Sequence, residues 1–120
     1  MADEIHLSRA RLTQKLLRER RSETRFPAKL SIQCRSEGMP VTTELAGVVR
    51  DVSTKGLRLI LENALPSGTV LTVLGPDNSP LLGAQISVVF ARPDAAGWLH
   101  GCLFAKMLTA AELALLLHTD

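Results

Sequence analysis

Between residues 28 and 107, hydrophobic and polar residues alternate in short runs, which is the pattern of half-buried β-strands. In the first run, Leu30, Ile32 and Cys34 alternate with polar residues. Segments rich in Gly, Pro, Asn and Ser separate the runs and are typical of turns. The pattern predicts six strands, over residues 28–36, 41–52, 56–62, 69–75, 81–92 and 97–107.

The segment before the first strand has a different pattern. Residues 5–20 contain neither Gly nor Pro and place Ile5, Leu12 and Leu16 near one helical face, which predicts a short N-terminal helix. Pro27 ends any helical tendency, because its ring removes a backbone donor and restricts the preceding residue.

The segment after the last strand also predicts a helix. Thr109 is followed three residues later by Glu112, the spacing of a capping box, and Ala and Leu dominate the next six positions. Leu113, Leu116 and Leu117 of this C-terminal helix could pack on the sheet or on a second chain, and we expect the sheet. The sequence therefore predicts one all-β domain, a six-stranded barrel or a sandwich, between two short helices.

The composition agrees with one domain and narrows the choice of function. The chain has 120 residues, of which 46% are hydrophobic, enough for one core, and 3% are aromatic, which argues against a base-stacking nucleic-acid surface. Cys34 and Cys102 form no CxxC pair and are expected to be buried thiols. No apolar run approaches the roughly 20 residues of a membrane helix, and the N-terminus lacks the apolar core of a signal peptide, so we expect no membrane span and a cytoplasmic location.

Positive charge is concentrated at the N-terminus. The net charge is +2, and residues 1–26 carry seven cations against four acids. The densest part is RERRSETRFPAKL, residues 18–30, with five cations and two acids. Charge alone leaves three readings open: a solvated helix end, a nucleic-acid arm, or an anion site.

A second polar cluster, RDVSTKGLRL, lies where one predicted strand passes to the next. Asp51 and Ser53 are two residues apart and would point to the same side of an extended backbone. A carboxylate can accept from the N1–H and N2–H groups of guanine, while arginines can bind its O6/N7 edge or a phosphate. Gly56 permits a close approach of a ligand or another strand. Taken alone, Asp-x-Ser-x-x-Gly is also an ordinary turn sequence.

The two clusters together are more specific than either alone. Arg21 and Arg25 form an RxxxR motif, and Asp51, Ser53 and Gly56 form a [D/N]xSxxG motif, with 26 positions from Arg25 to Asp51. In this order the chain resembles the PilZ domain, a bacterial receptor for cyclic di-GMP, over nearly its whole length. The resemblance implies a six-stranded antiparallel β-barrel with its C-terminal helix over residues 21–120, after a helical, basic extension over residues 1–20.

The resemblance also implies residue roles. Arg21 and Arg25 would lie on a flexible loop and grip the phosphates and guanine edges of cyclic di-GMP. Asp51 and Ser53 would bind a guanine, and Gly56 would keep the backbone turn open.

Arg20, just before the first motif, is a further expected contact that would favour a stacked ligand dimer, since guanidinium groups stack on purine faces. Arg50 and Arg58 flank the second motif, and each is as readily an exposed strand residue as a phosphate contact. Binding would order the N-terminal loop and signal to a protein partner, with no cofactor or metal required.

Three other functions fit the sequence less well. An enzyme would use Ser53, Asp51 and His100 as a triad, but no nucleophile-elbow sequence surrounds the serine, and His100 lies on an alternating strand. A nucleic-acid binder would use the basic N-terminus, against the mild net charge and the scarcity of aromatic residues. A protein-interaction barrel that has lost ligand binding would not need both motifs. The expected function is a non-enzymatic receptor.

Overall fold

Six strands and one helix make up the part of the chain that the structure, a computed structural model, describes, namely residues 24–37 and 43–118. The helix predicted over residues 5–20 lies outside these ranges. In chain order the elements are β1 Phe26–Ser36, β2 Thr43–Val52, β3 Gly56–Leu61, β4 Val70–Gly75, β5 Gln85–Asp94, β6 Gly97–Phe104 and α2 Ala110–Leu117.

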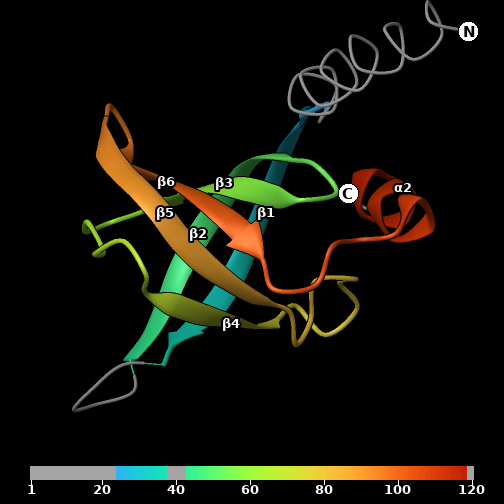
Figure 1. The fold of residues 1–120 in the computed structure, drawn as a ribbon, viewed down its shortest axis with the longest axis horizontal. Helices are drawn as coiled ribbons and strands as arrows, with labels where there is room; N and C mark the ends of the chain where they lie inside the picture. Colours follow the sequence, from blue (N-terminus) through green and yellow to red (C-terminus); the bar gives the residue numbers. More distant parts are fainter. Residues whose placement is uncertain (1–23, 38–42, 119–120) are drawn as a thin grey trace, which may run out of the picture.

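The strands close into a barrel in the order β1-β2-β3-β6-β5-β4. Each strand pairs antiparallel with its neighbours, and β4 pairs back onto β1, so the sheet has no free edge strand (Figure 1). Strands that are consecutive in sequence lie side by side, except that β3 and β4 are not neighbours. The prediction of an all-β, six-stranded antiparallel fold is confirmed.

Alternating side chains fill the barrel interior. Leu57, Leu59 and Leu61 of β3 point inward, as their spacing predicts, and are at most 2% exposed. Ile60, which the alternation places on the opposite face, is also covered, at 8% exposed. Burying an aliphatic side chain of this size contributes about 1.5–3 kcal/mol relative to leaving it in water. These aliphatic residues supply most of the core, as the low aromatic content requires.

Both cysteines lie in this core as free thiols, as predicted. Cys34 is fully buried and Cys102 is 3% exposed. Burial raises the pKa of Cys34 to about 11, and burial together with the neighbouring Cys34 raises the pKa of Cys102 to about 12. A buried thiol with a raised pKa stays protonated at neutral pH, which is typical of structural cysteines.

Several predicted strand boundaries differ from those in the structure, and two of them are wrong by three residues or more. The fifth strand begins at Gln85 rather than at residue 81, because the backbone N–H of Ala84 bonds the carbonyl of Leu81 and turns the chain. Leu81 is nevertheless fully buried, so its hydrophobicity reflects packing and not strand pairing. The sixth strand ends at Phe104 rather than at residue 107, where the chain leaves the sheet towards α2.

The C-terminal helix begins at the predicted capping box. The Thr109 hydroxyl accepts from the Glu112 backbone N–H at 3.0 Å, and the Glu112 carboxylate accepts from the Thr109 N–H at 2.8 Å. Leu113 and Leu116 are buried in the same core as the barrel residues, and Leu117 packs against it. The helix thus packs on the barrel. Among the described residues, no helix has the length and apolar character needed to cross a membrane.

Candidate functional site

A β-bulge directs Asp51 to the outer surface of the barrel. Val49 and Val52 are both fully buried although they are three positions apart, which strict alternation does not allow. The register between β2 and β3 shifts between Val49 and Asp51, so that Arg50 is the extra residue. The extra residue reverses the alternation, and the Asp51 side chain remains 15% exposed.

Two arginines flank the Asp51 carboxylate. Arg25 Nη1 donates to Asp51 Oδ1 at 3.2 Å, across 26 positions of sequence. Arg58 Nε lies 3.8 Å from Asp51 Oδ2, at a position that β2–β3 pairing places directly opposite. The structure therefore brings together one arginine of the first motif and the aspartate of the second. The sequence left Arg58 undecided, because only the bulged register shows which residue faces Asp51.

Ser53 organises the turn between β2 and β3. It is fully buried, and its hydroxyl accepts from the backbone N–H groups of Lys55 and Gly56, each at 3.2 Å. The extended backbone from which we predicted that Asp51 and Ser53 share one side does not reach Ser53, because β2 ends at Val52 and Ser53 belongs to the turn. These two hydrogen bonds stabilise the turn. A direct hydrogen bond from Ser53 to a ligand stays a prediction.

Gly56 is required by a neighbouring strand. A Cβ at this position would lie 2.1 Å from the carbonyl oxygen of Cys102 on β6, which is far inside contact distance. Its φ is not positive, so close approach and not backbone conformation demands glycine here. Of the two approaches that the sequence left open, by a ligand or by a strand, the structure shows the strand.

Arg20 and Arg21 lie outside the described residues, so their expected contacts stay predictions. Arg50 makes a two-bonded ion pair with Asp94 near the end of β5, with Nη1–Oδ1 and Nη2–Oδ2 distances of 2.8 and 3.1 Å. Hydrogen bonds from Arg50 and from the Ala96 backbone lower the pKa of Asp94 to about 2. This ion pair thus links β2 to the hairpin between β5 and β6.

Both ring nitrogens of His100 form hydrogen bonds with backbone groups, so His100 is not available as the base of a triad with Ser53 and Asp51. The Leu65 backbone N–H donates to His100 Nε2 at 3.0 Å, which places the ring proton on Nδ1, and Nδ1 donates to the Trp98 carbonyl at 3.0 Å. The ring is fully buried and holds the segment after β3 against β6. Within the described ranges, no group of three or more His, Cys, Asp or Glu residues could hold a metal ion.

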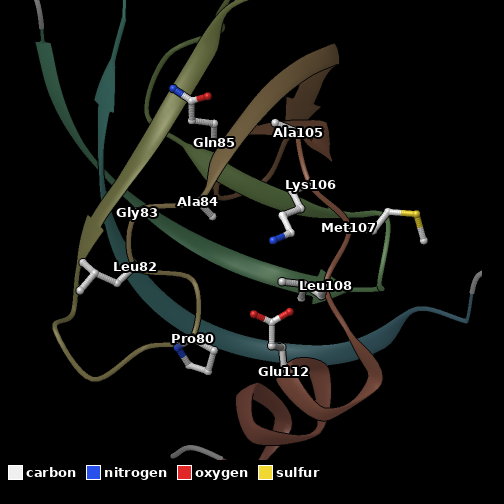
Figure 2. Close-up of a pocket in the computed structure, with 10 residues that line it drawn as sticks. All are labelled: Pro80, Leu82, Gly83, Ala84, Gln85, Ala105, Lys106, Met107, Leu108 and Glu112. Carbon is white, nitrogen blue, oxygen red and sulfur yellow. The ribbon is translucent and has the colours of Figure 1, made fainter.

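A separate pocket of about 380 Å³ lies between the turn before β5 and the segment that leads to α2. Figure 2 shows Leu82 on one side of this pocket, with Lys106 and Glu112 pointing into it. The Glu112 carboxylate already caps α2, and no arginine lines the pocket. The arrangement of a carboxylate between guanidinium groups, which suits a guanine nucleotide, is found at Asp51 instead.

The comparison with known protein families agrees with this geometry. Residues 19–118 match the sequence model of the PilZ domain, which includes the barrel, both motifs and α2. No curated protein matches the sequence. PilZ domains are cyclic di-GMP-binding effector domains rather than enzymes. Because the match covers most of its length, this chain belongs to the PilZ domain family.

Proposed function

We propose that this protein is a cyclic di-GMP receptor whose N-terminal RxxxR segment orders on ligand binding and signals to a protein partner. The observation that carries the proposal is the 3.2 Å contact between Arg25 and Asp51, which joins the two motifs on the outside of the barrel. Membership of the PilZ family supports the choice of ligand.

The chemistry of the site suits a guanine nucleotide. The Asp51 carboxylate is partly exposed and offers acceptors to the guanine N1–H and N2–H groups. When a guanine takes that edge, Arg25 is released to bind a phosphate, a charge-assisted contact that is stronger than a neutral hydrogen bond. Arg58 stays beside the second carboxylate oxygen and balances its charge.

Signalling follows from the place of Arg25 in the chain. Arg25 directly precedes β1, so a ligand that moves it also moves the residues before it, including Arg20 and Arg21, which we propose as further ligand contacts. A basic segment that closes on a ligand presents a new surface, and a partner protein that reads this surface would receive the signal. The ligand itself is the only small molecule required, and no cofactor is proposed.

Competition binding tests the proposal. Labelled cyclic di-GMP should bind the full chain, and unlabelled cyclic di-GMP should displace it while double-stranded DNA should not. Binding of DNA with no preference for the dinucleotide would support a nucleic-acid binder instead. If the unmodified protein does not bind the dinucleotide, and the Arg21→Ala and Asp51→Ala variants behave as it does in binding a partner, the barrel is an interaction module without a ligand.

A further inference from the structure

Exposed apolar side chains surround the pocket between the turn before β5 and the segment that leads to α2. Leu82 and Met107 lie on opposite sides of this pocket and are 45% and 54% exposed (Figure 2). Leu115 follows the pocket residue Glu112 by three positions, which places it next to Glu112 on the surface of α2, and it is 62% exposed. We call Leu82, Met107 and Leu115, together with Lys106, the α2 surface. Apolar groups gathered around a hollow mark a site of interaction with another molecule.

Backbone hydrogen bonds hold both walls of the pocket in place. The Gly83 N–H donates to the Val73 carbonyl at 2.8 Å, so the turn that carries Leu82 is tied to β4. The Ala105 N–H donates to the Gln85 carbonyl, also at 2.8 Å, so the opposite wall is tied to β5. The pocket is therefore preformed, and a partner that fills it does not have to order these two segments first.

The charge of the α2 surface favours an acidic partner. Lys106 points into the pocket and forms no ion pair with another described residue. Glu112 also points into the pocket, but its carboxylate accepts from the Thr109 N–H at 2.8 Å as part of the cap of α2. An ammonium group beside apolar side chains is complementary to a carboxylate that a partner brings.

Two other occupants fit this charge less well. A second copy of the chain, docked through the same surface about a two-fold axis, would bring two Lys106 side chains together. Residues 1–26 of the chain itself carry seven cations against four acids, so Lys106 would repel them too. A small molecule would fill the pocket and leave Met107 and Leu115 exposed. The α2 surface is therefore best suited to a segment of a different protein.

The α2 surface is connected to the turn between β2 and β3, which carries the second motif. The Leu108 N–H donates to the Thr54 carbonyl at 2.9 Å, and the Phe104 N–H donates to the Lys55 carbonyl at 2.8 Å. Lys106 lies between these two donors in the chain. A ligand that moves the turn would therefore also move this wall of the pocket.

We propose that the α2 surface docks an acidic segment of a downstream protein, with an apolar side chain of that segment in the pocket and a carboxylate on Lys106. This inference rests on the proposed function, because it gives the surface and the chemistry of the partner that this function requires. The apolar contact supplies most of the affinity, and the ion pair orients the segment and excludes basic ones. Ligand binding at Asp51 acts on the partner through the turn between β2 and β3.

Peptide selection followed by titration tests the docking surface. A phage-displayed library of short random peptides is selected on the full chain, and the selected peptides are synthesised and titrated by fluorescence anisotropy. They should carry Asp or Glu close to a large apolar residue. Their Kd should rise by at least about 5-fold with Leu82→Ser and with Lys106→Glu, and Lys106→Glu should prefer peptides whose acids are replaced by lysine. Lys29→Glu is the matched control, since Lys29 is an exposed lysine on β1, and its Kd should not change.

Two further measurements locate the contact and test its link to the ligand. The ε-methyl NMR signal of Met107 should shift when peptide is added, and thermal unfolding shows whether each variant is folded. Saturating cyclic di-GMP should change the peptide Kd by at least about 5-fold, and an unchanged Kd would overturn the signalling role of the surface.

Several results would overturn the docking surface itself. They are selection of no peptide, selection of peptides without acids, or an unchanged Kd with Lys106→Glu. Self-association in analytical ultracentrifugation that Leu82→Ser abolishes would assign the surface to a second copy instead. If any of these results is found while the unmodified protein binds cyclic di-GMP, the docking surface is wrong and the proposed function stands. If the unmodified protein does not bind cyclic di-GMP, the proposed function itself fails.

Discussion

Replacing Arg25 with alanine should weaken cyclic di-GMP binding while leaving the fold almost unchanged. The Arg25–Asp51 pair joins side chains that are 32% and 15% exposed, so solvent screens it and it stabilises the fold by about 0–1 kcal/mol. A charge-assisted hydrogen bond to the ligand contributes about 1.5–3 kcal/mol. Because binding must first break the Arg25–Asp51 pair, the net loss in the variant is about 0.5–3 kcal/mol, or about 2- to 150-fold in Kd.

Isothermal titration calorimetry measures this loss, and thermal unfolding measures the change in stability. Arg35→Ala is the matched control, because Arg35 lies on β1, the strand that Arg25 directly precedes, and its Nε makes a 3.1 Å ion pair, here with Glu37. The control should bind like the unmodified protein. An unchanged Kd for Arg25→Ala, or an equal loss in both variants, would refute the reasoning that Arg25 contacts the ligand.

Three further predictions concern the stability of the barrel and the reactivity of its buried thiols. Gly56→Ala should lower the free energy of unfolding by about 1–3 kcal/mol or more in chemical denaturation, because its Cβ would meet the Cys102 carbonyl oxygen at 2.1 Å; unchanged stability would contradict the strand contact. Cys34 and Cys102 should react with a thiol reagent at neutral pH only after unfolding, since burial raises their pKa values to about 11 and about 12. The Arg50 hydrogen bonds lower the pKa of Asp94 from 3.8 to about 2, so their stabilisation is present above pH 3.8 and is lost as the pH falls towards 2. Acid titration of Asp94→Asn should lack this loss, and an identical acid transition would contradict it.

The sequence predicts the barrel because a half-buried strand imposes a period of two, and β1 and β3 show that period clearly. It predicts the start of α2 because Thr109 and Glu112 satisfy each other's backbone groups locally. The wrong start of the fifth strand shows what hydrophobicity cannot predict. Leu81 is as hydrophobic as a strand residue, yet it is buried by a turn, and hydrophobicity alone does not distinguish the two.

The geometry of the site depends on features that have no local sequence signal. The apolar run at Val48–Val49 interrupts the alternation, but an interruption does not say which residue is extra or which side the next residue faces. Only pairing with β3 turns Asp51 outward. The motif likewise names Ser53 without showing that its hydroxyl holds the turn.

The central claim is that this chain binds cyclic di-GMP at the surface where Arg25, Asp51 and Arg58 meet. Calorimetric titration of the full chain with cyclic di-GMP, and with cyclic di-AMP for comparison, tests it most directly and also gives the number of ligands bound. We expect saturable binding of cyclic di-GMP that the Asp51→Ala variant loses, and much weaker binding of cyclic di-AMP, whose bases lack the paired N–H donors. Absence of binding, or equal binding of both dinucleotides, would contradict the claim.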